Sequence, residues 1–287
     1  MNKKVLILGS SGLIGHQVHN YLKQNSDYQL TNISHSRKLN SKTILLNVKN
    51  EVKLASEVNR IRPNFIINCI GVLITESKKN PDNAIYLNAY LPHKLLVIAN
   101  NINAKLIHIS TDCVFSGKKN QPYIESDYKD GIGIYPESKS LGEFVSSNHL
   151  TIRTSVVGPE LSLRDEELFN WFMNQSNEIN GYSKAIWSGV TTLELSRAIK
   201  FFIENGTVGL YHLTNGKAIS KYELITLFKF FTNKKNIVNK IDGVSSNKSF
   251  IDTREEINYQ IPSYKEMIKD MVLLIKNNKN LYRHYKL

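Results

Sequence analysis

The stretch VLILGSSGLIG, residues 5–15, constrains the fold more than any other part of this sequence. A run of apolar residues leads straight into three glycines, Gly9, Gly12 and Gly15, which lie three residues apart. We interpret the run as a buried strand and residues Leu13 to Lys23 as a helix that begins inside the glycine turn. In such a unit the first glycine permits a tight turn, the second lets backbone N–H groups approach a pyrophosphate, and the third lets the helix lie close on the strand. A structural turn with incidental glycines is the alternative.

Short apolar runs alternate with helix-like segments through the rest of the first half. Besides the first strand at residues 4–10, strands are expected at 28–34, 42–48, 64–71 and 104–110, and helices at 51–61 and 83–101. Continuous apolar strands that alternate with helices are typical of a parallel sheet covered on both faces. The sequence therefore predicts an α/β fold with a doubly wound parallel sheet, the Rossmann arrangement.

The region after Gly158 is less regular and richer in helices. Helices are expected at residues 165–175, 191–205, 221–231 and 263–276, with a short strand, GLYHLTN, at 209–215. We therefore expect a dinucleotide-binding Rossmann domain at residues 1–157 and a smaller, mainly helical substrate-binding lobe at residues 158–287, from which segments can return to the sheet.

Composition argues against several classes of function. The 287 residues carry a net charge of +12, but the lysines are scattered among asparagines and form no basic stripe, so we expect no nucleic-acid binding. The apolar runs are too short to cross a bilayer and the N-terminal residues show no cleavage-site pattern, so we expect no membrane partner and a cytoplasmic location. The two cysteines, Cys69 and Cys113, match no metal-ligand spacing. We interpret them as buried, reduced thiols and expect no metal.

The end of the second strand indicates which nicotinamide cofactor fits. An acidic residue at this position would bind the ribose 2′-hydroxyl of NAD. The sequence instead reads SHSRK, with Ser34, Ser36, Arg37 and Lys38. Hydroxyl groups followed by two cations suit a 2′-phosphate, which a guanidinium can bind through two hydrogen bonds. We therefore expect an NADP-binding domain, with NAD(H) less favoured than NADP(H) and a solvated basic loop as the alternative.

Further positions are expected to line the same cofactor. In the glycine turn these are Ser11, Leu13 and Ile14, besides the three glycines. At the ends of the third and fourth strands they are Asn47 and Val48, near the adenine, and Cys69, Ile70 and Gly71, beside the path of the cofactor. Asn88, a polar residue in an apolar helical segment, is expected to brace the loop after the fourth strand. A simple structural role is equally open for Asn47, the NCIG segment and Asn88.

The fifth strand ends in Ser110, Thr111 and Asp112, at the edge of the sheet where ligands bind in open α/β folds. The Thr111 hydroxyl could hydrogen-bond a substrate carbonyl. Tyr135 and Lys139 follow on the next helix, one turn apart. A nearby ammonium favours the tyrosinate and lowers the phenol pKa, and the lysine can also hold the nicotinamide ribose. A glycine turn, a hydroxyl at a strand end and Tyr-x-x-x-Lys, in this order, indicate a short-chain dehydrogenase/reductase.

Several longer motifs carry a resemblance to one branch of that class. They are GSSGLIG, STDCVFSG, YPESKSLGE, RTSVVGP, GVTTLELSRAI and GLYHLTNGKAISKYELI, which together cover nearly the whole chain. The sequence resembles the extended short-chain dehydrogenases, and among them the dTDP-4-dehydrorhamnose reductase-like proteins.

The resemblance implies an enzyme of surface polysaccharide biosynthesis that transfers a hydride from NADPH to the 4-keto group of a nucleotide-linked 6-deoxysugar. In that scheme Tyr135 gives a proton to the carbonyl oxygen, Lys139 tunes Tyr135 and binds the ribose, and Thr111 orients the carbonyl. The cofactor supplies the hydride chemistry and the protein orients it.

The residues after the fifth strand separate this activity from its neighbours. Sugar-nucleotide dehydratases of the superfamily read Thr-Asp-Glu there, whereas this chain has Cys113 in place of the glutamate, so dehydration is not expected. Two alternatives stay open. One is a sugar-nucleotide epimerase, and the other is a non-catalytic NADP-binding regulatory subunit, since the family includes a regulatory subunit of methionine adenosyltransferase. The presence of Thr111, Tyr135 and Lys139 favours the enzyme.

The substrate site is less readable than the cofactor site. We expect substrate contacts from Asp112, Val114, Lys184 and Trp187. Lys184 could meet a diphosphate, and Trp187 could stack on a sugar or base or belong to the core. Arg153 is structural as easily as ligand-facing. We expect a nucleotide-sugar substrate as the partner, and a homodimer is one possible oligomeric state.

Overall fold

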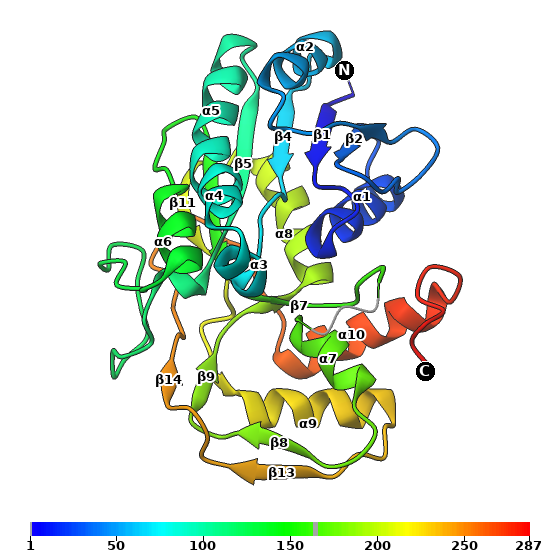
Figure 1. The fold of residues 1–287 in the computed structure, drawn as a ribbon, viewed down its shortest axis with the longest axis vertical. Coiled ribbons are helices and arrows are strands. Elements are labelled where there is room, and N and C mark those ends of the chain that lie inside the picture. Colours follow the sequence, from blue (N-terminus) through cyan, green and yellow to red (C-terminus); the bar gives the residue numbers. More distant parts are fainter. Residues whose placement is uncertain (1, 163–165) are drawn as a thin grey trace. The chain divides into compact units, whose positions relative to one another are not determined.

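The computed structural model describes residues 2–162 and 166–287, and the chain forms two compact units (Figure 1). Unit 1 contains residues 1–114, 131–153 and 196–211, and unit 2 contains residues 115–130, 154–195 and 212–287. The chain thus passes between the units several times, so unit 1 does not coincide with a continuous domain that ends at residue 157. Residues 196–211 return to the sheet of unit 1, and the residues between Thr111 and Tyr135 belong largely to unit 2.

Unit 1 is an alternating α/β structure, as the sequence predicts. Its elements are β1 (Lys4–Leu8), α1 (Leu13–Asn25), β2 (Gln29–Ser34), β3 (Ile44–Leu45), α2 (Glu51–Ile61), β4 (Phe65–Asn68), α3 (Ile74–Lys79), α4 (Pro81–Ala84), the π-helix η1 (Ile85–Tyr90), α5 (Leu91–Asn101), β5 (Lys105–Thr111), the 3₁₀ turn η2 (Asp112–Val114), α6 (Ile134–Leu141), β6 (Leu150–Thr154), most of α8 (Thr192–Asn205) and most of β11 (Gly209–His212). The expected long helix at 83–101 is divided by the π-helical turn η1.

The central sheet has seven strands among the residues that the structure describes, in the order β11-β6-β5-β4-β1-β2-β3. The pairs β1–β2, β1–β4, β4–β5 and β2–β3 are parallel. In this order the chain starts at β1 and moves outward first to one side and then to the other. The strand order therefore reverses between β1 and β4, and doubly wound sheets bind their ligands at such a topological switch point.

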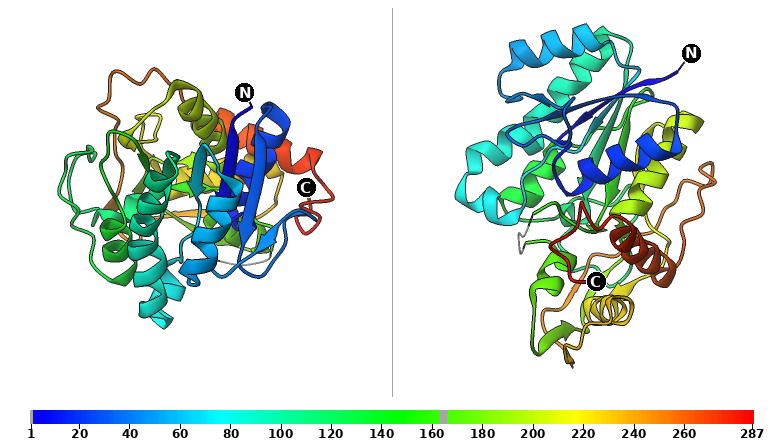
Figure 2. Two further views of the ribbon diagram at one scale, coloured as in Figure 1. Left: turned by 90° about the horizontal axis from the view of Figure 1, so that it is seen from above. Right: turned by 90° about the vertical axis from the view of Figure 1, so that its right-hand side faces the viewer.

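Helices cover both faces of the sheet. Figure 2 shows α1 and α8 on one face and α2, α5 and α6 on the other. The second face has a continuous apolar core, in which side chains of β1, β4 and β5, such as Leu6, Ile66 and Leu106, pack against Leu54 of α2 and Leu95 of α5. Because both faces are covered, the strands are apolar at almost every position rather than at alternate ones.

Unit 2 is built from short strands and longer helices. Its remaining elements are β7 (Val156–Val157), α7 (Leu168–Asn174), β8 (Ile179–Tyr182), β9 (Ala185–Trp187), β10 (Val190–Thr191), β12 (Ile219–Ser220), α9 (Lys221–Thr232), β13 (Val238–Ile241), β14 (Ser246–Asn247) and α10 (Tyr264–Asn277). Asp165, the expected start of the first helix, lies outside the described residues. Ser220 and Ser263 form capping boxes with Glu223 and Glu266, which fixes the first turns of α9 and α10.

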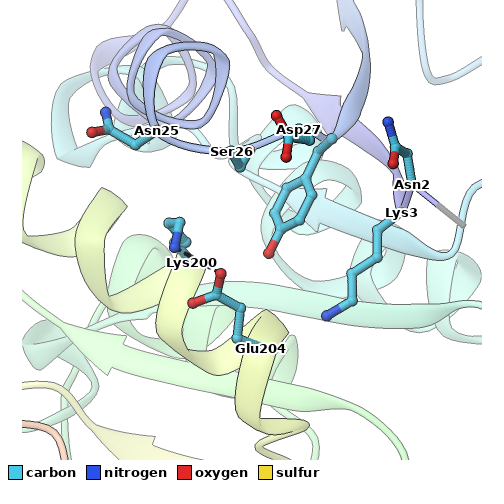
Figure 3. Close-up of a pocket in the computed structure, with 8 residues that line it drawn as sticks. Asn2, Lys3, Asn25, Ser26, Asp27, Lys200 and Glu204 are labelled. Carbon is cyan, nitrogen blue, oxygen red and sulfur yellow. Dashed lines mark hydrogen bonds and ion pairs between the residues drawn. The ribbon is translucent and has the colours of Figure 1, made fainter.

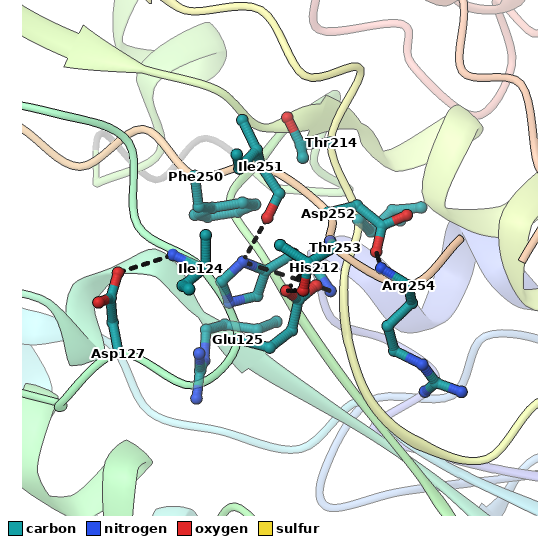
Figure 4. Close-up of polar contacts among 12 residues, drawn as sticks. Ile124, Glu125, Asp127, His212, Thr214, Phe250, Ile251, Asp252, Thr253 and Arg254 are labelled. Atoms are coloured by element: carbon teal, nitrogen blue, oxygen red, sulfur yellow. Dashed lines mark hydrogen bonds and ion pairs between the residues drawn. The ribbon is translucent and has the colours of Figure 1, made fainter. Parts of the chain in front are cut away.

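One partly buried carboxylate joins three segments of unit 2 (Figure 4). Glu125 accepts hydrogen bonds from the His212 backbone N–H at 3.0 Å and from the Thr253 hydroxyl at 2.7 Å. The Nδ1 atom of His212 lies 2.9 Å from the Ile251 carbonyl oxygen, and the His212 ring packs on the ring of Phe250. Residues 115–130 are thereby attached to residues 212 and 250–253. We call this arrangement the Glu125 clasp.

Candidate active site

The glycine turn lies against the end of β4. Gly9 has a φ of +78°, which an L side chain rarely adopts, and a Cβ there would meet the Cys69 backbone at 3.1 Å. A Cβ on Gly15 would lie 2.2 Å from the Gly9 carbonyl oxygen, so only glycine lets α1 approach this closely. Gly12 differs, because its Cβ would meet only the Gly9 carbonyl oxygen, at 3.4 Å. Packing within the chain explains Gly9 and Gly15, but it does not explain Gly12.

The first turn of α1 is directed at the same place. Gly12 is the N-cap residue and carries no side chain, so no side-chain cap fills the end of the helix. Gly12 is exposed, and Ser11, Leu13 and Ile14 are partly exposed. The first N–H groups of a helix have no partner within the helix, and they carry the positive end of its dipole. This terminus is suited to an anion such as a pyrophosphate.

The loop after β4 is held by two asparagines. Asn68 accepts a hydrogen bond from the Ile70 N–H at 3.1 Å. Asn88 of η1 accepts from the Val72 N–H at 3.0 Å and donates to the Val72 carbonyl at 3.1 Å and to the Ser138 hydroxyl at 3.2 Å. The predicted bracing role of Asn88 is confirmed. Cys69 and Ile70 are half-buried and Gly71 is exposed, so these residues form part of the surface at the end of β4.

The basic segment after β2 lies near the start of α1. Ser34 is buried, and its hydroxyl donates to the Arg37 carbonyl, whereas Ser36, Arg37 and Lys38 are exposed. The pKa of His16 is lowered to about 4, mainly by burial, and the positive charge of Arg37 contributes to this lowering. Because His16 lies in α1, this effect places the Arg37 charge close to the helix that begins at the glycine turn. Ser34 shapes the segment, and the cations remain at the surface.

Asn47 and Val48 follow β3. Asn47 is exposed and its side-chain oxygen accepts from the Lys49 N–H at 3.0 Å, which closes a local turn. The Val48 side chain is buried in the core. A cavity of about 390 Å³ has Asn47 in its wall, together with residues of β3 and α2.

The two residues of the Tyr-x-x-x-Lys motif lie on α6, as predicted. Lys139 is buried, and its ammonium donates to the Ile109 carbonyl of β5 at 2.7 Å. A Cβ on Gly71 would lie 3.9 Å from the Lys139 Nζ, so the ammonium also borders the loop after β4. Tyr135 is half-buried, one turn earlier on the helix. Burial lowers the pKa of Lys139 to about 8, and the charge of Glu143 opposes this effect.

Thr111 ends β5 and is almost completely buried. Its hydroxyl donates to the Asp112 carboxylate at 3.1 Å and accepts from the Cys113 N–H at 3.2 Å. To bond a substrate carbonyl, the Thr111 hydroxyl must exchange its bond with Asp112. Asp112 and Val114 are also buried, and the Val114 side chain is only 1% exposed.

A buried network under β5 is absent from the sequence-based prediction. Glu143 accepts from the Ser110 hydroxyl at 2.6 Å and forms a two-pronged ion pair with Arg153, with N···O distances of 2.9 and 2.7 Å. The side chains of Arg153 and Glu143 are 2% and 4% exposed. Arg153 is therefore structural in this unit. A charged residue inside the apolar strand LTIRT was the available signal.

The two expected substrate residues of unit 2 have different surroundings. Trp187 is 2% exposed and packs against Tyr264, with the Lys221 ammonium 5.2 Å from its ring centroid. These contacts favour the core role that the sequence left open. Lys184 is exposed and forms an ion pair with Asp242 at 2.7 Å.

Another cavity of unit 1 lies at the other end of the sheet (Figure 3). It has a volume of about 380 Å³ and is lined by residues at the start of β1, before β2, at the end of α1 and on α8, among them Lys3, Tyr28, Lys200 and Glu204. These positions precede the strands, whereas Thr111 and Cys69 lie where the strands end. The cavity is therefore separate from the candidate active site.

Among residues 2–162 and 166–287, no three His, Cys, Asp or Glu side chains are grouped so that they could hold a metal ion. Within the same ranges, no helix has the length and apolar character needed to cross a membrane.

The fold and this site together define a class of protein. A Rossmann sheet, a glycine turn at β1, a strand-end hydroxyl and a helix that carries Tyr135 and Lys139 are the parts of an extended short-chain dehydrogenase/reductase. The family model described as the RmlD substrate binding domain matches residues 3–258, most of the chain. The chain belongs to this family.

Curated relatives include enzymes and one subunit of a different enzyme. The chain is 29% identical over 229 residues to the spore coat polysaccharide biosynthesis protein SpsK of Bacillus subtilis, covering 78% of this chain and 77% of the relative. It is 26% identical to methionine adenosyltransferase 2 subunit beta of Pongo abelii, over 78% of this chain and 70% of that protein. A shorter match, 34% identical and covering 36% of each chain, is to dTDP-4-dehydrorhamnose reductase of Shigella flexneri.

Solved structures confirm the fold. The dTDP-4-dehydrorhamnose reductase of Bacillus anthracis, in complex with NADP, matches with a TM-score of 0.81 and 24% identity, covering 96% of this chain and all of the other. UDP-glucose 4-epimerase of Thermotoga maritima matches with a TM-score of 0.80 and 18% identity, over 96% and 99% of the two chains. Because a reductase and an epimerase fit equally well, the fold alone does not distinguish the two activities.

Proposed function

We propose that this chain is an NADPH-dependent oxidoreductase of the cytoplasm that reduces the 4-keto group of a nucleotide-linked 6-deoxysugar in surface polysaccharide biosynthesis. One observation carries the proposal: the Lys139 ammonium joins α6 to β5 and borders the loop after β4, so that Tyr135, Thr111 and the glycine turn belong to one end of one sheet. Relatives named as dTDP-sugar reductases and as a polysaccharide biosynthesis protein support the substrate class and the role.

The residues of unit 1 fit NADP(H). The exposed backbone of Gly12 and the N-terminus of α1 suit the pyrophosphate, and Arg37 and Lys38 suit a 2′-phosphate. Ser11, Leu13 and Ile14 would border the pyrophosphate. Asn47 and the backbone of Val48, whose side chain is buried, would border the adenine, and Cys69, Ile70 and Gly71 would border the nicotinamide half. When bound, NADPH supplies the hydride.

Tyr135 is proposed as the general acid. Its phenol would give a proton to the substrate carbonyl oxygen, and Thr111 would orient that oxygen with its hydroxyl. Lys139 holds its ammonium one turn away, where a positive charge stabilises the tyrosinate that remains. Because the pKa of Lys139 is lowered to about 8, the ammonium is charged below that pH and is lost above it. Reductase activity should therefore decline as the pH rises through about 8.

The test is a turnover assay with the intact chain. NADPH is mixed with a panel of 4-keto-6-deoxysugars linked to different nucleotides, and the loss of NADPH absorbance is followed. At least one member should be reduced, and the Tyr135→Phe variant should reduce the same member at least about 100-fold more slowly. If NADPH binds and no member is reduced, the proposal is wrong.

A non-catalytic subunit is the second candidate. Matches to methionine adenosyltransferase 2 subunit beta cover as much of this chain as the match to the polysaccharide protein. A subunit of this kind would bind NADP(H) without turnover in the panel assay. Tyr135, Lys139 and Thr111, which such a subunit would not need, favour the reductase.

We also propose that the chain forms a homodimer through the outer surface of α5, the end of α6 and the loop that follows α6, which contains Val145. Val97, Leu141 and Val145 are 54%, 67% and 79% exposed, and the His93 ring contacts the Leu141 carbonyl at 2.7 Å, which places the two elements side by side. Exposed apolar side chains that are grouped on neighbouring segments are typical of an interface. Sedimentation should show a dimer that Val145→Asp dissociates. A monomer at all concentrations would contradict this assignment.

A further inference from the structure

Glu143 lies outside the Tyr-x-x-x-Lys motif, yet its carboxylate contacts the strand that carries Thr111. Its Oε1 accepts from the Ser110 hydroxyl at 2.6 Å, and Ser110 directly precedes Thr111. The preceding residue on β5, Ile109, accepts from the Lys139 ammonium at 2.7 Å. Residues 139 and 143 therefore hold two consecutive residues of β5. Together these bonds fix the end of the strand relative to α6.

Glu143 is itself fixed by Arg153 of β6. Two hydrogen bonds, from Arg153 Nε to Oε1 and from Nη2 to Oε2, form the bidentate arrangement that is the strongest between these two groups. Both side chains are almost completely inaccessible to solvent, so salt and water do not screen the pair. The carboxylate consequently has one position and stays ionised beside β5.

The surroundings of Lys139 contain few other charges. The titratable groups that face it are Glu143, Cys69 after β4, His108 on β5, and Tyr135 on its own helix. Burial raises the pKa of the Cys69 thiol to about 12 and lowers the pKa of His108 well below its usual value, so both are uncharged at neutral pH. Of the groups just named, Glu143 is the anion.

We propose that Glu143, held by Arg153, is a positioning residue of the reductase site: it aligns Thr111 through Ser110 and keeps the buried Lys139 side chain protonated. The inference rests on the proposed function for its role in catalysis, but its electrostatic part concerns the protein alone. The buried Glu143–Arg153 ion pair would then have a role in catalysis in addition to its structural contact.

Substitution of Glu143 and substitution of Arg153 should shift the titration midpoint of Lys139 in opposite directions. In Glu143→Gln, Lys139 loses its anion and keeps a second buried cation nearby, so its titration midpoint should fall by about one pH unit, a tenfold change in the acid dissociation constant. In Arg153→Met, Glu143 is no longer neutralised and the midpoint should rise. A structural contact alone would not move the midpoint in opposite directions in the two variants.

The midpoint can be measured without turnover. The full chain is labelled with [¹³Cε]lysine, the Lys139 signal is assigned by its loss in Lys139→Met, and its chemical shift is followed against pH. Should Glu143→Gln fail to fold, the double variant Glu143→Gln/Arg153→Met removes both charges of the pair and should still lower the midpoint. Ser110→Ala breaks the hydrogen bond but leaves every charge in place, so it should keep the wild-type midpoint.

The outcomes separate this inference from the proposed function. Opposite shifts in the two single variants support the inference, whether or not any sugar is reduced. In an active enzyme, Glu143→Gln should also lower kcat more at pH 8 than at pH 6, with KM nearly unchanged. Midpoints that are the same in wild type, Glu143→Gln and Arg153→Met would overturn the inference, even if the reductase assay succeeds.

Discussion

The residues proposed for catalysis in unit 1 and those proposed for substrate binding in unit 2 differ in how firmly the surrounding structure holds their side chains. In unit 1, the Lys139 ammonium, the Thr111 hydroxyl and the Asn88 amide each have polar partners on a neighbouring segment or residue. In unit 2, Trp187 is packed into the core and Lys184 extends into solvent beside Asp242. The residues proposed for proton transfer and carbonyl binding therefore have fixed polar partners at one edge of the sheet. Of the two residues of unit 2 that were expected to contact the substrate, packing fixes Trp187, and only a solvent-exposed ion pair holds Lys184.

Of the substitutions considered, removal of the Tyr135 hydroxyl should have the largest effect on activity. Tyr135→Phe keeps the ring and deletes the proton donor, so kcat should fall by about 10²- to 10⁴-fold. NADPH affinity should change little, because Lys139 and the glycine turn remain. Steady-state kinetics and fluorescence titration with NADPH measure the two quantities. A variant that keeps substantial turnover would contradict the assigned role of the phenol.

A variant of the Glu125 clasp tests whether unit 2 also contains polar contacts that stabilise the fold. Glu125→Ala removes hydrogen bonds to His212 and Thr253, which should lower the free energy of unfolding by about 2–3 kcal/mol at pH 7. Glu256→Ala, at an exposed ion pair with Arg254, is the matched control and should leave stability unchanged. Urea unfolding measures both. Equal stability of the two variants would show that the clasp is not a stabilising feature.

The same variant has a defined pH dependence. Burial raises the pKa of Glu125, but the His212 charge and the Thr253 hydrogen bond outweigh it, so the net pKa is lowered. A carboxyl whose folded pKa is depressed stabilises the protein fully above its unfolded pKa of about 4.3, and the stabilisation is lost as the pH falls through the folded value. The difference between wild type and Glu125→Ala should therefore shrink on acidification below about pH 4. A difference that grows there would contradict the assignment.

Replacing the exposed cation after β2 should have a smaller and more selective effect. Arg37→Ala should weaken NADPH binding by about tenfold while NADH binding stays nearly the same, since only NADPH carries the 2′-phosphate. Lys42→Ala, in an exposed position a few residues further on, serves as the control. Equal losses for the two cofactors would show that Arg37 does not contact the phosphate.

The smallest effect is expected from Lys184. Its ion pair with Asp242 is open to solvent, and such pairs contribute little to stability. Lys184→Ala should leave thermal unfolding unchanged. Any rise in KM for the sugar nucleotide would therefore indicate a direct contact with substrate, whereas an unchanged KM would remove Lys184 from the site.

Much of the fold was predictable because unit 1 follows strong local rules. The helix expected at 51–61 is α2, residue for residue, since Asn50 caps its start and Arg62 leaves the helix with a φ of +48°. The π-turn η1 was not predictable, because its apolar sequence continues the helical pattern on both sides. The short strands of unit 2 were also not predicted, since two-residue pairings leave almost no periodic signal.

The candidate site divides in the same way. Gly9, Gly15, Thr111, Tyr135 and Lys139 occupy the predicted elements because motif spacing and strand ends fix their places. The Glu143–Arg153 pair joins residues ten apart that are brought together only by the approach of β6, so spacing alone gave no partner for either. For Trp187, a tryptophan in a short apolar run is compatible with stacking or burial, and only the packing distinguishes them.

Transfer of a labelled hydride tests the central claim most directly. The chain is supplied with NADPH that carries deuterium at the transferable position of the nicotinamide, together with a 4-keto-6-deoxysugar nucleotide, and the sugar product is examined by NMR. We expect deuterium at C4 of the sugar in step with NADPH consumption, and incorporation at least about 100-fold slower with Tyr135→Phe. Bound NADPH that transfers no deuterium to any sugar of the panel would contradict the account.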